Sequence, residues 1–92
     1  MKKILIPLAK GFEEIEAVTS IDVLRRAGLD VLTAGIGSRE IEGDHEIKVE
    51  TDIEISDVNA EDFDAVVLPG GMPGAANLRD SNQLRKIIKK LK

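Results

Sequence analysis

Residues 64–71 read DAVVLPGG, and this stretch decides the fold. Its four consecutive apolar residues are typical of a strand that is buried on both faces of a parallel sheet. The strand runs directly into proline and glycine, which mark a turn between a strand and a following helix. A similar apolar run, ILIPLA at residues 4–9, opens the chain and predicts a neighbouring strand.

A helix is predicted from Glu13 to Ala27. Acidic residues fill its first turn and Arg25 and Arg26 its last, as the helix dipole favours, and Gly28 supplies the C-cap. Apolar residues recur along it at helical spacing: Ile15, Ala17, Val18, Ile21 and Leu24.

The remaining segments complete the order of elements. Residues 29–34 predict a second strand, and residues 58–63 predict a turn with a brief helix. Residues 40–55 alternate apolar and polar side chains, which predicts short, half-exposed strands or an excursion from the main sheet. The fold class is therefore α/β: a flavodoxin-like, doubly wound parallel sheet of three strands in an α/β/α sandwich.

The last predicted helix begins at a cap, Asp80 or Ser81, and runs to Lys92. Its apolar side consists of Leu84, Ile87, Ile88 and Leu91. This side needs a sheet to cover, yet no further strand follows it. We therefore expect the fold to be incomplete in this chain, with residues 1–92 forming the amino-terminal half of one domain. The carboxyl-terminal half would come from the same protein or from a second chain.

Composition excludes several classes of protein. The 92 residues are 42% hydrophobic and 33% charged and include no cysteine, which excludes disulfides, thiolate metal sites and a cysteine nucleophile within this chain. No apolar run approaches the roughly 18 residues of a membrane span, and no signal peptide precedes the first strand, so we expect a cytoplasmic protein.

The net charge of −4 is unevenly distributed. Residues 40–64 carry eleven acids and one lysine, whereas residues 79–92 carry six basic residues and one acid. The basic end could bind nucleic acid, but the solvated face of a helix accounts for it, and 2% aromatic content offers no stacking platform for bases. We expect no nucleic-acid partner, no metal and no other cofactor.

Two segments follow the carboxyl ends of predicted parallel strands, residues 9–16 and residues 69–74, and should meet at one end of the sheet. In the second segment, Gly70 and Gly71 could present backbone N–H groups to an anion or an oxyanion, although an ordinary tight turn would also explain them. The turn has neither the glycine fingerprint of dinucleotide-binding proteins nor the Gly-Lys-Ser/Thr of a P-loop.

Three carboxylates occupy the first turn of the predicted helix. The helix dipole accounts for Glu13 and Glu14. Glu16 lies three residues from Glu13 and shares its side of the helix, while Glu14 turns away. Burial in a cleft would raise the pKa of Glu16 and suit it to acid–base work; the alternative is a third carboxylate that only complements the dipole.

His45 is the single histidine and stands between Asp44 and Glu46. One histidine cannot build a metal site by itself. We expect a surface or interface histidine, more readily charged beside these acids and able to reach an acidic side chain of another subunit.

Four pieces of the sequence, in colinear order, resemble the amino-terminal half of the ThiJ/PfpI family, also called the DJ-1 superfamily. They are AKGFEEIEA at 9–17, DVLRRAG at 22–28, DAVVLPGG at 64–71 and GAANL at 74–78. The resemblance implies a flavodoxin-like sandwich, usually a homodimer, with a reactive cysteine on a nucleophile elbow beyond the residues of this chain. It also implies that Glu16 hydrogen-bonds this cysteine, and that the amides of Gly70 and Gly71 face the thiolate and polarise a substrate oxyanion.

The resemblance implies a cysteine-dependent enzyme that acts on small reactive carbonyls or their adducts, as a glyoxalase or deglycase does, or that acts as a hydrolase. One alternative is a non-catalytic redox sensor or chaperone-like stress protein that uses the same pocket. Another is a glutamine-amidotransferase-like domain, which would need a downstream Cys, His and Glu triad. Without the nucleophile, the 92 residues alone should be inactive.

Overall fold

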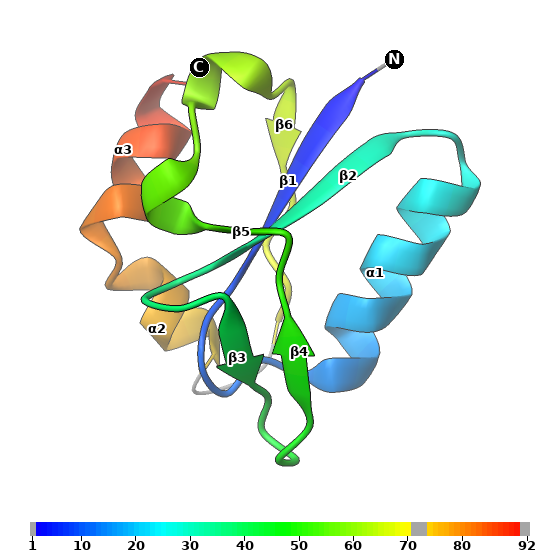
Figure 1. Ribbon diagram of the computed structural model, residues 1–92, viewed down its shortest axis with the longest axis vertical. Helices are drawn as coiled ribbons and strands as arrows, with labels where there is room; N and C mark the ends of the chain where they lie inside the picture. Colours follow the sequence, from blue (N-terminus) through cyan, green and yellow to red (C-terminus); the bar gives the residue numbers. More distant parts are fainter. Residues whose placement is uncertain (1, 71–73, 91–92) are drawn as a thin grey trace.

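A computed structural model describes residues 2–70 and 74–90. Four parallel strands form the main sheet in the order β5-β2-β1-β6. Helix α1 (Glu14–Arg26) covers one face, and α2 (Gly74–Arg79) and α3 (Asn82–Lys90) cover the other (Figure 1). The predicted α/β class and three-layer, flavodoxin-like arrangement are confirmed. Within these residues, no helix has both the length and the apolar character that a membrane crossing requires.

Strand β1 (Lys3–Leu8) lies at the centre of the sheet and is almost completely buried. Its side chains alternate between the two faces, as the pleat of a strand requires. Leu5 packs against residues of α2 and α3, whereas Ile4, Ile6 and Leu8 pack against the α1 side. Each face of β1 therefore supplies the middle of one of the two cores.

Strand β2 (Asp30–Gly35) pairs with β1 along its whole length. Its other neighbour is β5 (Ile53–Glu54), so the sheet has four strands and the predicted count of three is wrong. The fourth strand is only two residues long, and the period-2 pattern of residues 40–55 does not separate it from the excursion. Asp52 fixes its start, because the Asp52 carboxylate accepts hydrogen bonds from the Thr33 backbone N–H (2.9 Å) and hydroxyl (3.1 Å).

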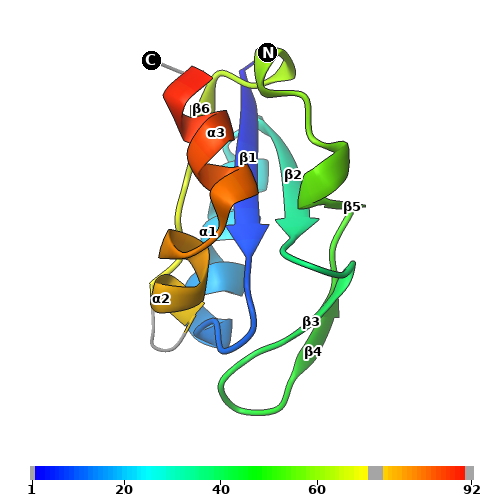
Figure 2. The same cartoon turned by 90° about the vertical axis from the view of Figure 1, so that its left-hand side faces the viewer.

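The excursion itself is an antiparallel hairpin of β3 (Glu40–Glu42) and β4 (Lys48–Glu50). It extends past the carboxyl ends of β1 and β2 (Figure 2). Two short 3₁₀ helices, Ile55–Asp57 and Ala60–Asp62, then lead back to the sheet, and the second is the brief helix predicted there.

Strand β6 (Ala65–Val66) is less buried than the apolar run at residues 64–68 predicts. Two backbone hydrogen bonds extend its pairing with β1, from Asp64 N to Lys3 O (2.8 Å) and from Val67 N to Leu5 O (2.9 Å). Within residues 2–70 and 74–90, however, β6 pairs with β1 alone, and Leu68 is 52% exposed. The strand lies at an edge of the sheet, which explains its exposure.

The helix ends follow the predicted capping. The carboxylate of Glu13 accepts from the N–H of Ile15 at the start of α1, and Gly28, with φ of +85°, follows its C-cap at Ala27. Ser81 caps α3 by accepting from the N–H of Leu84 at 3.2 Å. Leu91 and Lys92, which we placed in this helix, lie outside the described residues.

The structure departs from the sequence pattern of the helices in two places. The apolar stripe of α1 is buried at Ala17 but not at Ile15 and Val18, which are 76% and 51% exposed. The sequence pattern also did not predict α2, because its first residue is a glycine that we counted with the preceding turn.

Gly74 begins α2 in direct contact with the turn that follows β1. Its N–H donates to the carbonyl of Gly11 at 3.1 Å. A Cβ at this position would lie 2.6 Å from Cα and 2.8 Å from N of Phe12. Both are backbone atoms of a buried residue, so neither can move aside cheaply.

Gly74→Ala should therefore lower the free energy of unfolding by about 1–3 kcal/mol, the usual cost of overpacking. Helix propensity alone predicts the opposite sign, a gain of up to about 1 kcal/mol. Chemical denaturation of the intact protein measures the change. Ala76→Gly in the same helix is the matched control: it should destabilise the protein, as helix propensity alone predicts. A Gly74→Ala protein as stable as the parent would contradict the contact.

Candidate active site

The two segments predicted to meet do meet at the carboxyl ends of β1 and β6. The N–H of Glu13 donates to the carbonyl of Gly70 at 3.4 Å. Asn77 of α2 closes the junction, because its side-chain amide donates to the carbonyl of Lys10 at 2.7 Å. Gly71, the other half of the predicted backbone cradle, lies outside the described residues.

Glu16 lies against the bare backbone of Gly70. A Cβ at Gly70 would approach Oε2 of Glu16 to 2.8 Å, so the carboxylate lies in the space that the missing side chain of Gly70 leaves free. Both residues line an open pocket of about 380 Å³ with Ile15, Thr19, Ser20, Leu68 and Pro69. The structure thus brings together the carboxylate and one of the two glycines that the sequence singled out.

The Glu16 side chain is exposed. It accepts no hydrogen bond from any other residue within 2–70 and 74–90. The described residues therefore do not supply the desolvation on which an acid–base role would depend.

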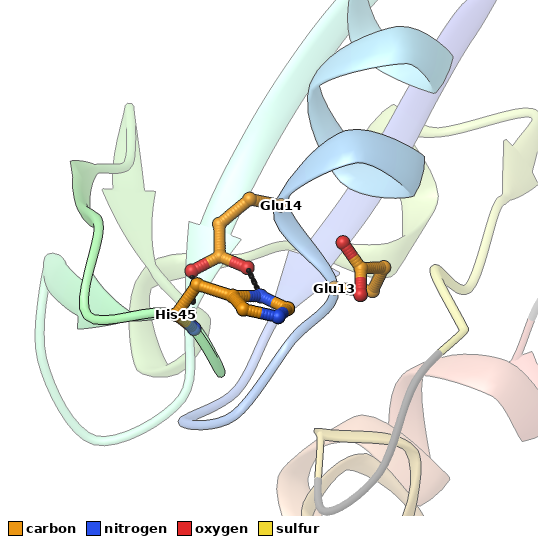
Figure 3. A group of neighbouring side chains, drawn as sticks. All are labelled: Glu13, Glu14 and His45. Atoms are coloured by element: carbon orange, nitrogen blue, oxygen red, sulfur yellow. Dashed lines mark hydrogen bonds and ion pairs between the residues drawn. The ribbon is translucent and has the colours of Figure 1, made fainter.

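Glu14 is the buried carboxylate of this turn: it turns away from the side of Glu16, as predicted, but the prediction that the helix dipole alone accounts for it is wrong. Only 5% of the residue is exposed. Its Oε2 accepts hydrogen bonds from the backbone N–H of His45 (2.7 Å) and Ile47 (3.4 Å), and its Oε1 lies 2.8 Å from Nδ1 of His45. Figure 3 shows the carboxylate facing the imidazole across the gap between α1 and the hairpin.

These contacts move the two pKa values in opposite directions. Burial alone would raise the pKa of Glu14, but hydrogen bonds from the His45 side chain and from backbone N–H groups lower it to about 2. The pKa of His45 is raised above its ordinary value by the hydrogen bond and the charge of Glu14, and then by the charge of Glu13. Asp44 adds a smaller contribution.

The partner of His45 is thus an acid of its own chain, 31 residues away in sequence, and not the neighbours Asp44 and Glu46. Sequence reasoning missed this pair because nothing in a local pattern links the first turn of a helix to the tip of a distant hairpin. A role for His45 at a subunit interface stays a prediction.

The same cluster is a poor fit for a metal ion. Ligand atoms of Glu13, Glu14 and His45 lie within 4.8 Å of one another. Glu14, however, already accepts hydrogen bonds from three donors, so only Glu13 and His45 remain as possible metal ligands. Even a catalytic zinc site uses three protein ligands. The arrangement favours a hydrogen-bonded ion pair.

The chain matches a protein family, curated proteins and solved structures over nearly its whole length. The model of the DJ-1/PfpI family matches residues 2–92. The chain belongs to the DJ-1/PfpI family. It is 44% identical over 90 residues to protein DJ-1 homolog B of Arabidopsis thaliana, and 39% identical over 90 residues to the Parkinson disease protein 7 homolog of Danio rerio. It superposes on the structure of oxidized DJ-1 from Toxoplasma gondii with a TM-score of 0.93 and 42% identity.

These matches cover nearly all of the chain but only part of each relative. They include 97% of the chain and 20% of the Arabidopsis protein, and 96% of the chain and 48% of the Danio protein. The Toxoplasma comparison covers 98% of the chain and 50% of that structure. The chain therefore spans between a fifth and a half of the length of these DJ-1 relatives.

The ion pair predicts a defined dependence of stability on pH. The lowered pKa of Glu14 means that its contribution is present above its ordinary pKa of 4.5 and is lost as the pH falls toward 2. The raised pKa of His45 means that its contribution is present below its ordinary pKa of 6.5 and is lost as the pH rises through the higher value. The pair should therefore stabilise the fold most between pH 4.5 and 6.5.

Glu14→Gln should accordingly lower the Tm of the intact protein more at about pH 5.5 than at about pH 3 or pH 9. Thermal unfolding of parent and variant at the three pH values measures the difference. Glu40→Gln, which removes an exposed acid from the same hairpin, is the control and should give a difference that varies little with pH. A Glu14→Gln difference that is equally flat would argue against the ion pair.

Proposed function

We propose that this chain is the amino-terminal half of a cytoplasmic, cysteine-dependent DJ-1/PfpI protein that acts on small reactive carbonyls or their adducts, in the manner of a glyoxalase or deglycase. The observation that carries the proposal is the contact between the Glu16 carboxylate and the backbone of Gly70 at the carboxyl ends of β1 and β6. Membership of the DJ-1/PfpI family supports it.

The chemistry divides between the two halves of such a protein. A cysteine from the carboxyl-terminal half would supply the nucleophile, which attacks the carbon of an aldehyde. Backbone N–H groups of the turn at Gly70 would stabilise the oxyanion that this attack forms. Glu16 would move protons, first to and from the enediol as the adduct isomerises to a thioester, and then as water hydrolyses that thioester, which breaks the C–S bond, releases the acid and frees the cysteine.

The pocket at Glu16 is suited to this role in size and in lining. Its apolar wall, Ile15 and Leu68, would exclude water from one side of the substrate, while Glu16 and the turn at Gly70 present polar groups on the other. A small carbonyl compound fits a pocket of about 380 Å³ that a second half-domain narrows.

A second candidate is a redox sensor that uses the same site without turnover. The DJ-1 of Toxoplasma gondii on which this chain superposes is an oxidized form of that protein. A protonated Glu16 beside a cysteine would donate a hydrogen bond to a sulfinate as readily as to a thiolate. Turnover of methylglyoxal by the intact protein separates the two candidates, because a sensor would show none.

We propose that a carboxyl-terminal half packs beside β6. An apolar pocket of about 300 Å³ opens between the segment that follows β6 and the helices α2 and α3; its lining includes Leu68, Leu78, Leu84 and Ile88. In an open parallel sheet, the strand after β6 would pair with its free edge and cover this surface. Such an addition would also enclose the Glu16 pocket, which Leu68 and Pro69 share with it.

We also propose a homodimer through α1 and the hairpin. Three large apolar side chains of α1 and one of the hairpin are more than half exposed: Ile15, Val18, Val23 and Ile47. Clusters of exposed apolar groups on a folded chain mark an interaction surface. A second copy would cover them and would lie close to the Glu16 pocket, because Ile15 belongs to both.

Glu16→Gln in the intact protein should keep the fold and the reactive thiol but lower methylglyoxal turnover by about 10²–10⁴-fold, the usual contribution of a general acid–base group. The glutamine side chain keeps the shape of glutamate and can donate a hydrogen bond, but it cannot gain or lose a proton. Asp22→Asn, an exposed acid of the same helix that pairs with Arg26, is the control and should turn over normally. Parental turnover by Glu16→Gln would leave Glu16 as a helix-end carboxylate only.

Val18→Lys in the intact protein should shift the molecular mass measured by light scattering from dimer to monomer, because a buried unpaired charge opposes association. Gln83→Lys, on the exposed side of α3, introduces the same charge away from the proposed interface and should leave the mass unchanged. A parent protein that is monomeric at all concentrations would refute the dimer.

A further inference from the structure

The tip of the β3–β4 hairpin is tied to the start of α1 by contacts of two kinds. Two are backbone hydrogen bonds, from Gly11 N to Glu42 O and from Asp44 N to Phe12 O, each 2.9 Å long. The others are all hydrogen bonds to the carboxylate of Glu14. It accepts from two backbone N–H groups of the hairpin and from the ring of His45. Only this second set depends on ionisable groups.

The hairpin is shaped around that carboxylate. A Cβ at Gly43 would lie 2.5 Å from Cδ and Oε2 of Glu14, so only glycine lets the turn close over it. Glu46 adopts a positive φ of 66°, which costs energy for a residue other than glycine and brings the N–H of Ile47 toward the same oxygen. The missing Cβ of Gly43 and the positive φ of Glu46 thus both allow the hairpin to surround Glu14.

The same carboxylate belongs to the turn that forms the candidate active site. Glu13, the residue before it, donates its N–H to the carbonyl of Gly70 at 3.4 Å. Glu16, two residues after it, lies against Gly70 on the other side. Any force on the Glu14 side chain therefore acts on a single helical turn, Glu13 to Glu16, whose two ends both lie against Gly70.

We propose that Glu14 and His45 are a positioning pair, in which protonation of His45 tightens the hold of the hairpin on the first turn of α1 and so adjusts where Glu16 stands relative to Gly70. The proposal goes beyond the proposed reaction. It concerns geometry and can be tested whatever chemistry the site performs.

The charges around His45 give the effect its direction. Those that act on the ring are acidic: Glu14 and Glu13 at the start of α1, and Asp44 in the hairpin. The His45 side chain is 64% exposed, so its proton exchanges with solvent, whereas the Glu14 side chain is only 7% exposed. Below the pKa of His45 the pair is ionic; above it a neutral imidazole can still donate from Nδ1, but the charge attraction is gone. The attachment of the hairpin to the first turn of α1 therefore weakens as the pH rises.

A nuclear magnetic resonance titration of the labelled, intact protein tests the proposal. We expect the ring signal of His45 to titrate with a midpoint above 6.5. The amide signals of Glu13, Glu16 and Gly70 should shift with that same midpoint. Hydrogen exchange at the N–H of Ile47, corrected for intrinsic rates, should be slower below the midpoint than above it.

Two variants separate positioning from a merely structural contact. Glu14→Gln keeps an acceptor oxygen but no charge, so the His45 midpoint should fall toward 6.5 and the linked shift of Gly70 should disappear. His45→Asn keeps a side-chain N–H donor but cannot titrate, so it should remove the pH dependence of Gly70 while leaving the fold intact. Glu40→Gln, an exposed acid of the hairpin that does not act on the ring, should leave both midpoints unchanged.

The proposal fails if the Gly70 amide does not respond through the His45 midpoint in the parent protein. It also fails if the response survives in His45→Asn. If Glu14→Gln does not fold, His45→Asn alone tests the proposal. His45 is the exposed member of the pair, so its substitution should leave the fold intact.

Discussion

Burial of β1 on both faces of a parallel sheet is the constraint on which the rest of the structure depends. Leu5, Ile6 and Leu8 are fully buried, and each such side chain contributes about 1.5–3 kcal/mol by leaving water. No strand can be buried in this way unless helices cover both faces and strands pair with both edges. The α1 helix, the α2 and α3 helices, β2 and β6 are the elements that meet these four requirements.

The location of the candidate site follows from the same constraint. Because β1 and β6 run parallel as neighbours, the turns that follow them emerge at the same end of the sheet and come into contact. Glycine at position 70 then leaves room for a carboxylate where any other residue would place a side chain. The sheet brings the two segments together, and the missing Cβ decides which group occupies the space between them.

Long apolar and amphipathic segments of this sequence are predictable because their partners are generic. Residues 4–9 show their burial locally, the helix from Glu13 shows its ends locally, and the carboxyl-end rule then places Glu16 near Gly70. Elements defined by a particular distant partner are not predictable in this way. The two-residue strand β5 exists because Asp52 bonds to Thr33, and Glu14 is buried because the hairpin closes on it. The exposure of Leu68 was likewise hidden, since an apolar run does not show whether its strand lies at the centre of a sheet or at its edge.

The parallel order of the sheet also has a consequence for the sequence of events in folding. Lys3 at the start of β1 accepts a backbone hydrogen bond from Asp64, 61 residues later, whereas its contacts with β2 span about half that distance. Closing longer loops costs more entropy, so the β1–α1–β2 unit can form before the second edge of β1 is paired. During synthesis, which proceeds from the amino terminus, β1 must wait with one edge open until residues 64–67 leave the ribosome. The period in which this apolar strand is half paired is the interval when the chain is most exposed to misassembly.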